Sequence, residues 1–292
     1  MSTDLVLVAG GTGRLGRLVV AQLSNRRVNV RVMTRDPELA HSLASNHVEI
    51  IAGDVRDEAS ITAAMESVTL VVSAIQGFAG TGRVSPKSVD RDGNIALIAA
   101  AKNVGAGVVL MSTVGASTDN PMELFRMKFA AERALLESNV PATIVRATAF
   151  AELWIDLMRT TVGRSNRPLV FGRGRNPINF VSVRDVAALV DRVVLDPESR
   201  GQTFEIGGPA DVTLNQLAQL AVKGAGGPVN IRHVPRAMLW AMAMSIGRFR
   251  PELGRQARAA LAMDDDDMTF PRLGARDRWS DLPLTTIAEI VG

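Results

Sequence analysis

The chain has 292 residues, of which 47% are hydrophobic and 22% charged, as in a globular protein that buries a large core. It contains no cysteine, which excludes disulfides, thiolate metal sites and cysteine nucleophiles, and its three histidines are not spaced as metal ligands. The formal charge of +3 comes without a basic run interleaved with aromatic residues, so we expect no nucleic-acid interface. No apolar stretch reaches the ~18 residues of a spanning helix, and Leu5–Ala9 is too short for a signal peptide core. We therefore expect no membrane span and a cytoplasmic location.

Strand and helix patterns alternate over the first half of the chain. Short apolar runs closed by turn residues predict buried parallel strands over Leu5–Ala9, Val28–Met33, Val48–Ile51, Leu70–Ala74, Val108–Ser112 and Ala142–Arg146. Apolar residues at helical spacing predict helices between them, over Leu15–Leu23, Pro37–Ala44, Asp57–Ser67, Val89–Asn103 and Phe125–Ser138. This alternation implies parallel pairing with right-handed crossovers, so we predict the α/β class with a Rossmann-type doubly wound parallel sheet.

The pattern loosens after Arg146. The later segments predict a strand that enters a helix at Phe180–Val183, a strand over Thr203–Ile206, a helix over Leu214–Val222 capped by Thr213, and a Met-rich helix over Met238–Ile246. The acidic run Asp264–Asp267 is interpreted as a solvated loop or helix start in preference to a metal site.

A glycine-rich turn follows the first strand and opens the first helix. Gly10, Gly13 and Gly16 have the spacing G-x-x-G-x-x-G, which allows a tight turn, the approach of a pyrophosphate to the backbone, and close packing of the helix. The free N–H groups of the helix N-terminus favour phosphate. We therefore predict that this turn binds a dinucleotide, with further contacts from Thr12, Arg14 and Leu15. A glycine turn without a ligand is the alternative.

The residues that end the second predicted strand distinguish NAD(H) from NADP(H) as the dinucleotide. NAD-binding folds usually carry an acidic residue there for the ribose 2′-hydroxyl, whereas this chain has Thr34-Arg35. A guanidinium suits a 2′-phosphate, so we predict NADP(H) over NAD(H), although Asp36 follows directly and a solvated Arg35 is the alternative. Asp54-Val55 follows the third strand, where the carboxylate would accept from the adenine amino group. Capping of the next helix by Asp54 is an equally weighted interpretation.

Taken in order, these segments resemble the atypical short-chain dehydrogenase/reductase superfamily, particularly its NmrA-like and isoflavone-reductase-like branches. The resemblance covers roughly residues 4–220. It rests on Gly10–Gly16, Thr34-Arg35, Gly53-Asp54, Val72–Ala74, Asn94, Leu110–Thr113, Lys128 with Glu132, Thr143–Arg146, Phe150, Phe180–Ala187 and Gly207–Pro209. It implies an NAD(P)-binding Rossmann domain over residues 1–150 and a smaller C-terminal substrate-binding lobe over residues 151–292, with segments that return to the Rossmann core.

The resemblance also implies roles for individual residues. The strand end Ser73-Ala74-Ile75 would line the cofactor's ribose and nicotinamide, and Ser112-Thr113 would lie beside the nicotinamide. Lys128 would bind the ribose hydroxyls. The substrate would contact three further residues, Gln76, Phe150 and Trp154.

One departure from the family pattern concerns the chemistry. Related enzymes have a Tyr-x-x-x-Lys pair, but Leu124 stands four residues before Lys128 and the chain contains no tyrosine. Lys128 itself could act as the general acid. Ribose binding alone, or a surface pair with Glu132 at i,i+4, are the alternatives. Ser112 or Thr113 could polarise a substrate carbonyl or merely satisfy the backbone.

Two functions are compatible with these residues. The first is an NADPH-dependent oxidoreductase that transfers hydride to a small, largely apolar carbonyl, quinone or conjugated substrate, with Lys128 or water supplying the proton. The second is a non-catalytic NADP-sensing regulatory protein of the NmrA type. A sugar-nucleotide epimerase ranks lower because it would use the missing tyrosine. The large apolar residues of the C-terminal lobe suit an aromatic substrate, although core packing or a homodimer interface is the preferred interpretation.

Overall fold

The computed structural model describes residues 5–162, 167–222, 229–270 and 274–292. The chain forms two compact units. Unit 1 comprises residues 1–120, 124–146 and 186–205, and unit 2 comprises residues 121–123, 147–185 and 206–292. The chain therefore passes from one unit to the other several times.

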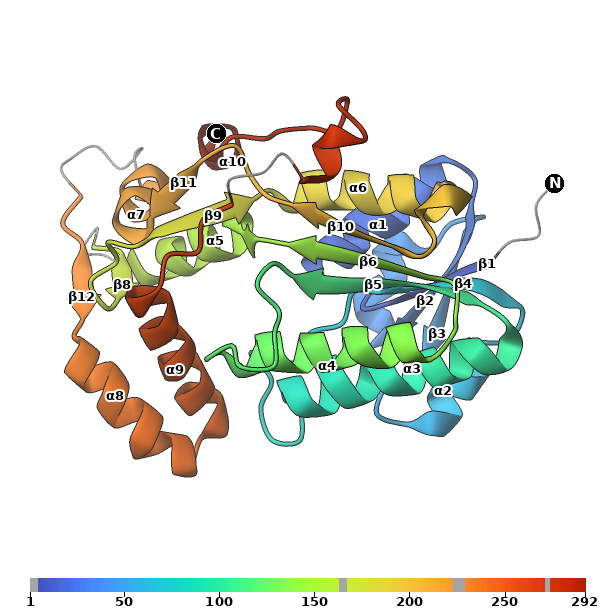
Figure 1. Cartoon of the computed structure of the whole chain (residues 1–292), viewed down its shortest axis with the longest axis horizontal. Helices are drawn as coiled ribbons and strands as arrows, with labels where there is room; N and C mark the ends of the chain where they lie inside the picture. The colour runs from blue at the N-terminus through green and yellow to red at the C-terminus, as the bar shows by residue number, and fades with distance from the viewer. Residues whose placement is uncertain (1–4, 163–166, 223–228, 271–273) are drawn as a thin grey trace. The chain divides into compact units, whose positions relative to one another are not determined.

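Unit 1 is built on one sheet of seven strands in the order β10-β6-β5-β4-β1-β2-β3 (Figure 1). The strands are β1 (Leu5–Ala9), β2 (Asn29–Thr34), β3 (Val48–Ala52), β4 (Val68–Ser73), β5 (Gly107–Thr113), β6 (Ala142–Ala147) and β10 (Gln202–Ile206). β1 pairs in parallel with β2 and β4, and the pairs β2–β3 and β4–β5 are parallel as well. The predicted Rossmann-type sheet is confirmed. Because the strand order reverses between β1 and β4, the carboxyl edge of these two strands is the topological switch point, where open α/β sheets bind ligands.

Helices cover both faces of this sheet. α1 (Arg14–Asn25) and α6 (Val183–Leu195) lie on one face, and α2 (Glu58–Ala64), α3 (Asp92–Val104) and α4 (Glu123–Glu137) lie on the other (Figure 1). Short 3-10 turns occupy η1 (Pro37–Leu43) and η4 (Pro197–Ser199). An ion pair of 2.8 Å joins Arg26, which follows α1, to Asp191 of α6. Cover on both faces explains why β1 is an unbroken apolar run.

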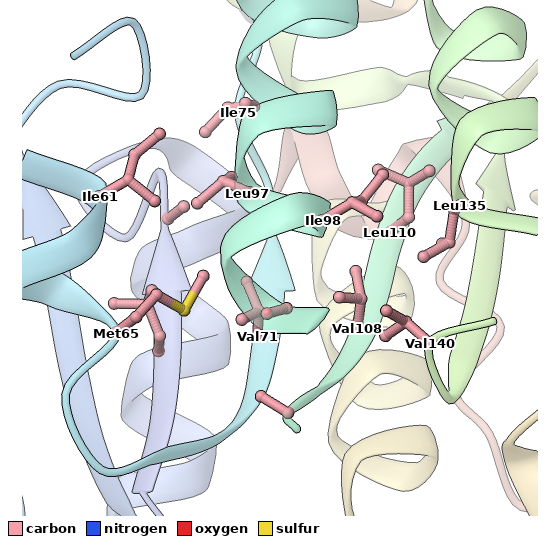
Figure 2. Close-up of a cluster of buried hydrophobic side chains, with 14 of the residues drawn as sticks. Ile61, Met65, Val71, Ile75, Leu97, Ile98, Val108, Leu110, Leu135 and Val140 are labelled. Carbon is pink, nitrogen blue, oxygen red and sulfur yellow. The ribbon is translucent and has the colours of Figure 1, made fainter. Parts of the chain in front are cut away.

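The core between the sheet and α2, α3 and α4 is closely packed, as Figure 2 shows. Its labelled side chains are Ile61, Met65, Val71, Ile75, Leu97, Ile98, Val108, Leu110, Leu135 and Val140. Truncating one such side chain typically costs 2–5 kcal/mol, roughly speaking, because a cavity replaces its contacts. This packing holds the carboxyl ends of β4 and β5 in place relative to α3 and α4.

Unit 2 contains two small sheets with the strand orders β11-β9-β7 and β12-β8. Its strands are β7 (Ala149–Phe150), β8 (Leu169–Phe171), β9 (Pro177–Val181), β11 (Asp211–Thr213) and β12 (Arg232–Val234). Its helical segments are α5 (Ala151–Val162), α7 (Leu214–Val222), α8 (Arg236–Met244), η5 (Ile246–Arg248), α9 (Pro251–Asp265), η6 (Gly274–Asp277) and α10 (Ile287–Val291). The predicted cap of α7 is confirmed, because the Thr213 hydroxyl accepts from the backbone N–H of Gln216 at 3.1 Å.

The interpretation of Asp264 as part of a solvated loop or helix start is wrong. Asp264 is buried in the last turn of α9. Its carboxylate accepts from the backbone N–H of Gly174 at 3.0 Å and pairs with Arg173 at 3.1 Å and Arg236 at 2.8 Å. These partners compensate the burial of the charge. The remaining members of the acidic run, 265–267, are exposed.

Candidate cofactor and active site

The glycine turn after β1 has the shape that the sequence predicts. Gly10 has a φ of +86°, and a Cβ atom there would lie 2.7 Å from the carbonyl oxygen of Ala74. A Cβ atom on Gly16 would lie 2.2 Å from the carbonyl oxygen of Gly10, so α1 packs closely against the turn itself. Gly13 is exposed and precedes the first residue of α1 without a side-chain cap. Its own N–H donates to the carbonyl oxygen of Gly10 at 3.0 Å, so the groups left for a ligand beside this exposed glycine are the free N–H groups of the helix start.

Arg17, which the sequence analysis did not single out, holds this turn in place. Its Nε donates to the carbonyl oxygen of Thr12 at 2.9 Å, and its Nη1 donates to Ser42 at 3.2 Å. The hydroxyl oxygen of Thr12 lies 3.5 Å from that of Thr34, at the end of β2. These contacts fix the turn beside the end of β2. The sequence did not indicate them, because an arginine within a helix has no pattern that identifies its partners.

Arg35, the predicted ligand of the 2′-phosphate, is exposed directly after β2. It forms no hydrogen bond or ion pair with any other residue that the structure describes. Arg14 and Leu15 begin α1, where Arg14 is exposed and Leu15 is buried. Two exposed guanidinium groups thus flank the glycine turn, one on the first residue of α1 and one directly after β2.

Asp54 does not cap α2. The cap is Asp57, whose carboxylate accepts from the backbone N–H of Ser60 at 3.1 Å. The Asp54 carboxylate pairs instead with Arg56 at 2.5 Å, and this hydrogen bond lowers the pKa of Asp54, with the positive charge of Arg35 acting in the same direction. The alternative interpretation of Asp54 as a helix cap is therefore wrong. The adjacent Val55 is half-buried.

The ends of β4 and β5 carry three hydroxyl groups in different surroundings. The buried Ser73 donates to Asn94 at 2.5 Å, so its hydroxyl is used inside the unit. Thr113 makes only a local contact of 3.4 Å with the carbonyl oxygen of Val114. Ser112 is buried, and its hydroxyl has no hydrogen-bond partner among the described residues. A buried polar group rarely lacks a partner, so the Ser112 hydroxyl differs from that of Ser73 in having its hydrogen-bonding capacity unused by the described residues.

Lys128 is buried in α4 and forms an ion pair that the sequence analysis missed. Its Nζ lies 3.0 Å from Oδ1 of Asp90, and the two side chains are 8% and 0% exposed. The same Nζ donates to the carbonyl oxygen of Ile75 at 2.9 Å. Burial raises the pKa of Asp90, and the charge of Lys128 opposes that shift. The alternative prediction that Lys128 forms a surface ion pair with Glu132 is therefore wrong, because Glu132 pairs with Arg146 at 2.6 Å.

A π-helical turn, η2 (Pro86–Arg91), positions Asp90. A capping box between Ser85 and Ser88 starts this turn, three residues before the helix that the sequence analysis expected. The second carboxylate oxygen of Asp90 accepts from the backbone N–H of Gly77 at 2.8 Å. The backbone carbonyl oxygen of Asp90 accepts from the side-chain amide of Asn94 at 2.7 Å. Two features of the sequence could have indicated this arrangement: Ser85-Pro86 at the start of the turn, and the i,i+4 spacing of Asp90 and Asn94. π-turns frequently mark functional positions.

The remaining predicted residues are divided between the two units. Leu124 is half-buried in the first turn of α4, one turn before Lys128, and Gln76 is exposed in unit 1 after β4. Ala74 and Ile75, beside it, are half-buried and buried. Phe150 and Trp154 are half-buried in unit 2, where the rings of Trp154 and Phe180 make a T-shaped contact with their centroids 6.3 Å apart.

These residues fit a dinucleotide within unit 1. Gly10, Gly13 and Gly16 form a turn that side chains would fill, at the topological switch point of the sheet. An unpartnered hydroxyl and a buried cation lie at the neighbouring strand ends. Among the described residues, no group of three or more His, Asp or Glu gathers as metal ligands, and no helix is long and apolar enough to cross a membrane.

Comparison with known proteins gives matches along most of the chain. A model of the NmrA-like family matches residues 2–257. The chain is 28% identical to NAD(P)H azoreductase of Xenophilus azovorans over 98% of this chain and 96% of that protein. It is 28% identical to Photosystem II assembly factor Ycf39 of Trieres chinensis over 84% of this chain and 76% of that protein. The NADPH complex of quinone oxidoreductase QOR2 from Escherichia coli has the same fold, with a TM-score of 0.76 at 23% identity over 98% of both chains.

Proposed function

Because the chain belongs to the NmrA-like family, we propose that it binds NADP(H) and reduces a small, largely apolar carbonyl, quinone or conjugated compound. The observation that carries this proposal is the convergence of the exposed Gly13, the unpartnered Ser112 hydroxyl and the buried Lys128 cation at the carboxyl edge of β1, β4 and β5. NADPH, when bound, supplies hydride. The protein must then hold the cofactor, orient the substrate and provide a proton.

The binding roles follow from the charge and exposure of each residue. We assign the pyrophosphate to the backbone around Gly13 and the first turn of α1. The 2′-phosphate is assigned to Arg35 with help from Arg14, since an exposed guanidinium can pair with it in a bidentate way. The adenine is assigned to Asp54 and Val55.

The chemical roles centre on Lys128, since Leu124 carries no exchangeable proton. Asp90 and the carbonyl oxygen of Ile75 hold the Lys128 ammonium in one orientation. From there it donates to the ribose hydroxyls or gives a proton to the reduced oxygen of the substrate. Ser112 donates a hydrogen bond to that oxygen, which is a role that its lack of a protein partner supports.

The substrate class rests on the relatives and on the lobe over residues 151–292. The azoreductase and the quinone oxidoreductase are named for conjugated electron acceptors. Phe150 and Trp154 offer half-buried aromatic surface in unit 2, and we assign the apolar part of the substrate to them and Gln76 to its polar end. An aromatic side chain is well suited to such a planar compound.

A second candidate is a non-catalytic NADP-sensing protein. Leu124 in place of the proton-donating tyrosine favours it, and so does the engagement of the Lys128 ammonium by Asp90 and Ile75. One relative is named as an assembly factor and not as an enzyme. In this case the dinucleotide would be bound without being consumed.

NADPH oxidation against a panel of quinones and aromatic ketones separates the two candidates. We expect turnover with at least one member of the panel, and a strong loss of turnover in Lys128→Ala with NADPH binding retained. Tight NADPH binding with no turnover on any member would refute the reductase and support the sensor. Full turnover in Lys128→Ala would refute the role of this lysine alone.

The cofactor choice has a separate test. Arg35→Ala should weaken NADPH binding by roughly 10- to 100-fold, the usual range for one charge-assisted contact, and should leave NADH binding nearly unchanged. Arg133→Ala is the control, because Arg133 is exposed on α4 and, among the residues that the structure describes, pairs with Glu137 alone at 2.8 Å. Equal losses for the two cofactors in Arg35→Ala would refute the assignment.

A further inference from the structure

Unit 2 carries a helical hairpin, α8–η5–α9, whose outer surface is unusually apolar. α8 and α9 lie side by side and η5 joins them (Figure 1). Leu239 and Ala243 of α8 are buried. Trp240 and Met244, one turn apart on another face of α8, are exposed. This short helix is therefore apolar on both its buried and its exposed face.

The exposed apolar side chains of this hairpin extend from α8, where Met238 is 55% exposed, through η5 to the residues before α9. We define the hairpin tip as Trp240, Met244, Ile246, Arg248, Phe249 and Arg250. The four apolar members are 62%, 63%, 42% and 86% exposed in chain order. Surfaces of soluble proteins rarely gather such groups without a partner, because exposed apolar area is unfavourable in water.

The hairpin tip itself contains two arginines and no acidic residue, whereas Arg236 at the start of α8 pairs with Asp264 and Asp265. Residues 229–250 contain four arginines and neither aspartate nor glutamate. Arg248 and Arg250 flank Phe249 directly, and both are exposed. Arg248 forms no side-chain ion pair with the described residues, and Arg250 makes a contact of 3.3 Å with Glu252. The hairpin tip thus combines protruding apolar groups with flanking cations.

The hairpin backbone holds these side chains outward. Gly247 and Gly254 approach so closely that a Cβ atom on Gly254 would lie 2.6 Å from the Cα of Gly247. Arg258 of α9 donates to the carbonyl oxygen of Ala243 at 3.2 Å. The turn is therefore tightly closed, and Phe249 is presented at its outer end without being folded back onto the hairpin.

We propose that the hairpin tip docks this protein on the surface of an anionic phospholipid bilayer. Phe249, Met244 and Trp240 enter the boundary between headgroups and acyl chains, and Arg248 and Arg250 contact the phosphates. A lipid surface accepts separate protruding side chains, whereas a protein partner would need a complementary hollow for each. A second copy would bring Arg248 and Arg250 against like charges across a two-fold axis. The proposal does not depend on the reductase activity.

Co-sedimentation of the full chain with lipid vesicles tests this proposal. We expect binding to phosphatidylcholine vesicles that contain phosphatidylglycerol, and little binding to phosphatidylcholine alone. Phe249→Ser should reduce the partition constant about tenfold or more, since it removes one inserted aromatic side chain. Arg248→Ser should reduce it roughly fivefold, as for one cation near an anionic surface, and the effect should shrink at high salt.

Leu136→Ser is the matched control, because Leu136 is 61% exposed on α4 in unit 1. It should bind vesicles like the unmodified chain, and the unfolding midpoint of all three variants should be unchanged. No binding to anionic vesicles, equal binding to both vesicle types, or equal weakening by Leu136→Ser would overturn the proposal. Sedimentation velocity without lipid provides a further check. A dimer that Phe249→Ser dissociates would assign the hairpin tip to a second copy and likewise overturn it.

Discussion

Replacing Asp90 with asparagine should destabilise the protein, because the variant leaves the Lys128 ammonium buried without its counter-ion. At 3.0 Å the two charges attract each other by about 5.5 kcal/mol if the effective dielectric constant is about 20. Desolvation of both groups offsets much of this attraction, and breaking a buried pair usually costs roughly 3–5 kcal/mol. The asparagine can still accept from Gly77, and Lys128 keeps its bond to Ile75. We therefore expect a loss of about 2–4 kcal/mol in the free energy of unfolding.

A double-mutant cycle with Lys128→Met isolates the pair. Urea unfolding at pH 7 of both single variants and the double variant should give a coupling energy of about 2–3 kcal/mol, because the double variant buries neither charge. Coupling below about 0.5 kcal/mol would refute the reasoning that the pair acts as an energetic unit.

The pH dependence of Lys128→Met gives an independent check on the same pair. Burial already raises the pKa of Asp90 above its ordinary 3.8, and loss of the lysine charge would raise it further. The folded state of the variant then takes up a proton before the unfolded state does as the pH falls. Its stability should therefore increase on going from pH 7 toward pH 5, relative to the unmodified chain. If the difference in unfolding free energy between Lys128→Met and the unmodified chain stayed constant from pH 7 to pH 5, the Asp90 carboxyl would not be buried without a partner in the variant.

Three further outcomes can be measured without a known substrate. Gly16→Ala should lower stability, because its Cβ would lie 2.2 Å from the carbonyl oxygen of Gly10. Gly13→Ala, whose Cβ would lie 3.2 Å from the same oxygen, should lower the urea midpoint much less and weaken NADPH binding in a titration. Ser112→Ala should leave stability within about 0.5 kcal/mol, whereas Thr143→Val should cost about 1–2 kcal/mol in urea unfolding, because Thr143 donates to a buried carbonyl at 2.8 Å. Burial alone would raise the pKa of Asp264, but hydrogen bonds from two arginine side chains and two backbone amides outweigh it and hold that pKa below 3.8. Asp264→Asn should therefore destabilise the protein at pH 7. The difference in the free energy of unfolding between this variant and the unmodified chain should narrow as the pH falls below about 3.8, where the carboxylate takes up a proton. A difference that stays constant at acidic pH would contradict the ion pairing of Asp264.

The sheet could be predicted from the sequence because its evidence is local. Each buried strand is a short apolar run, and the spacing of the glycines indicates where β1 ends and α1 begins. The element boundaries shifted by a few residues, as at η2, where a serine cap starts a π-turn before the predicted helix. The small strands β7, β8, β11 and β12 were not predicted, because runs of two or three residues carry no periodicity.

The candidate site was only partly predictable, because its key contacts join residues that lie far apart in the chain. Lys128 could be selected from its resemblance to a known motif, but its partner Asp90 lies on another helical segment. Asp264 looked solvated because its neighbours are acidic, and only the fold brings Arg173 and Arg236 to it. The sequence alone therefore indicates which strand ends carry polar groups, and the packing decides which of those groups are satisfied within the protein.

The interleaving of the two units has a consequence for the order in which the chain can fold during synthesis. β10, the last strand of the main sheet, is made of residues 202–206 and lies beside β6, residues 142–147. Until the ribosome has released β10, β6 remains an edge strand with open N–H and C=O groups, which is a template for aggregation. A fragment that ends at residue 150 would keep that edge permanently. Soluble expression of the cofactor-binding half therefore requires residues 186–205 to be supplied with it, and a ribosomal pause before β10 would be a point of vulnerability for this protein in the cell.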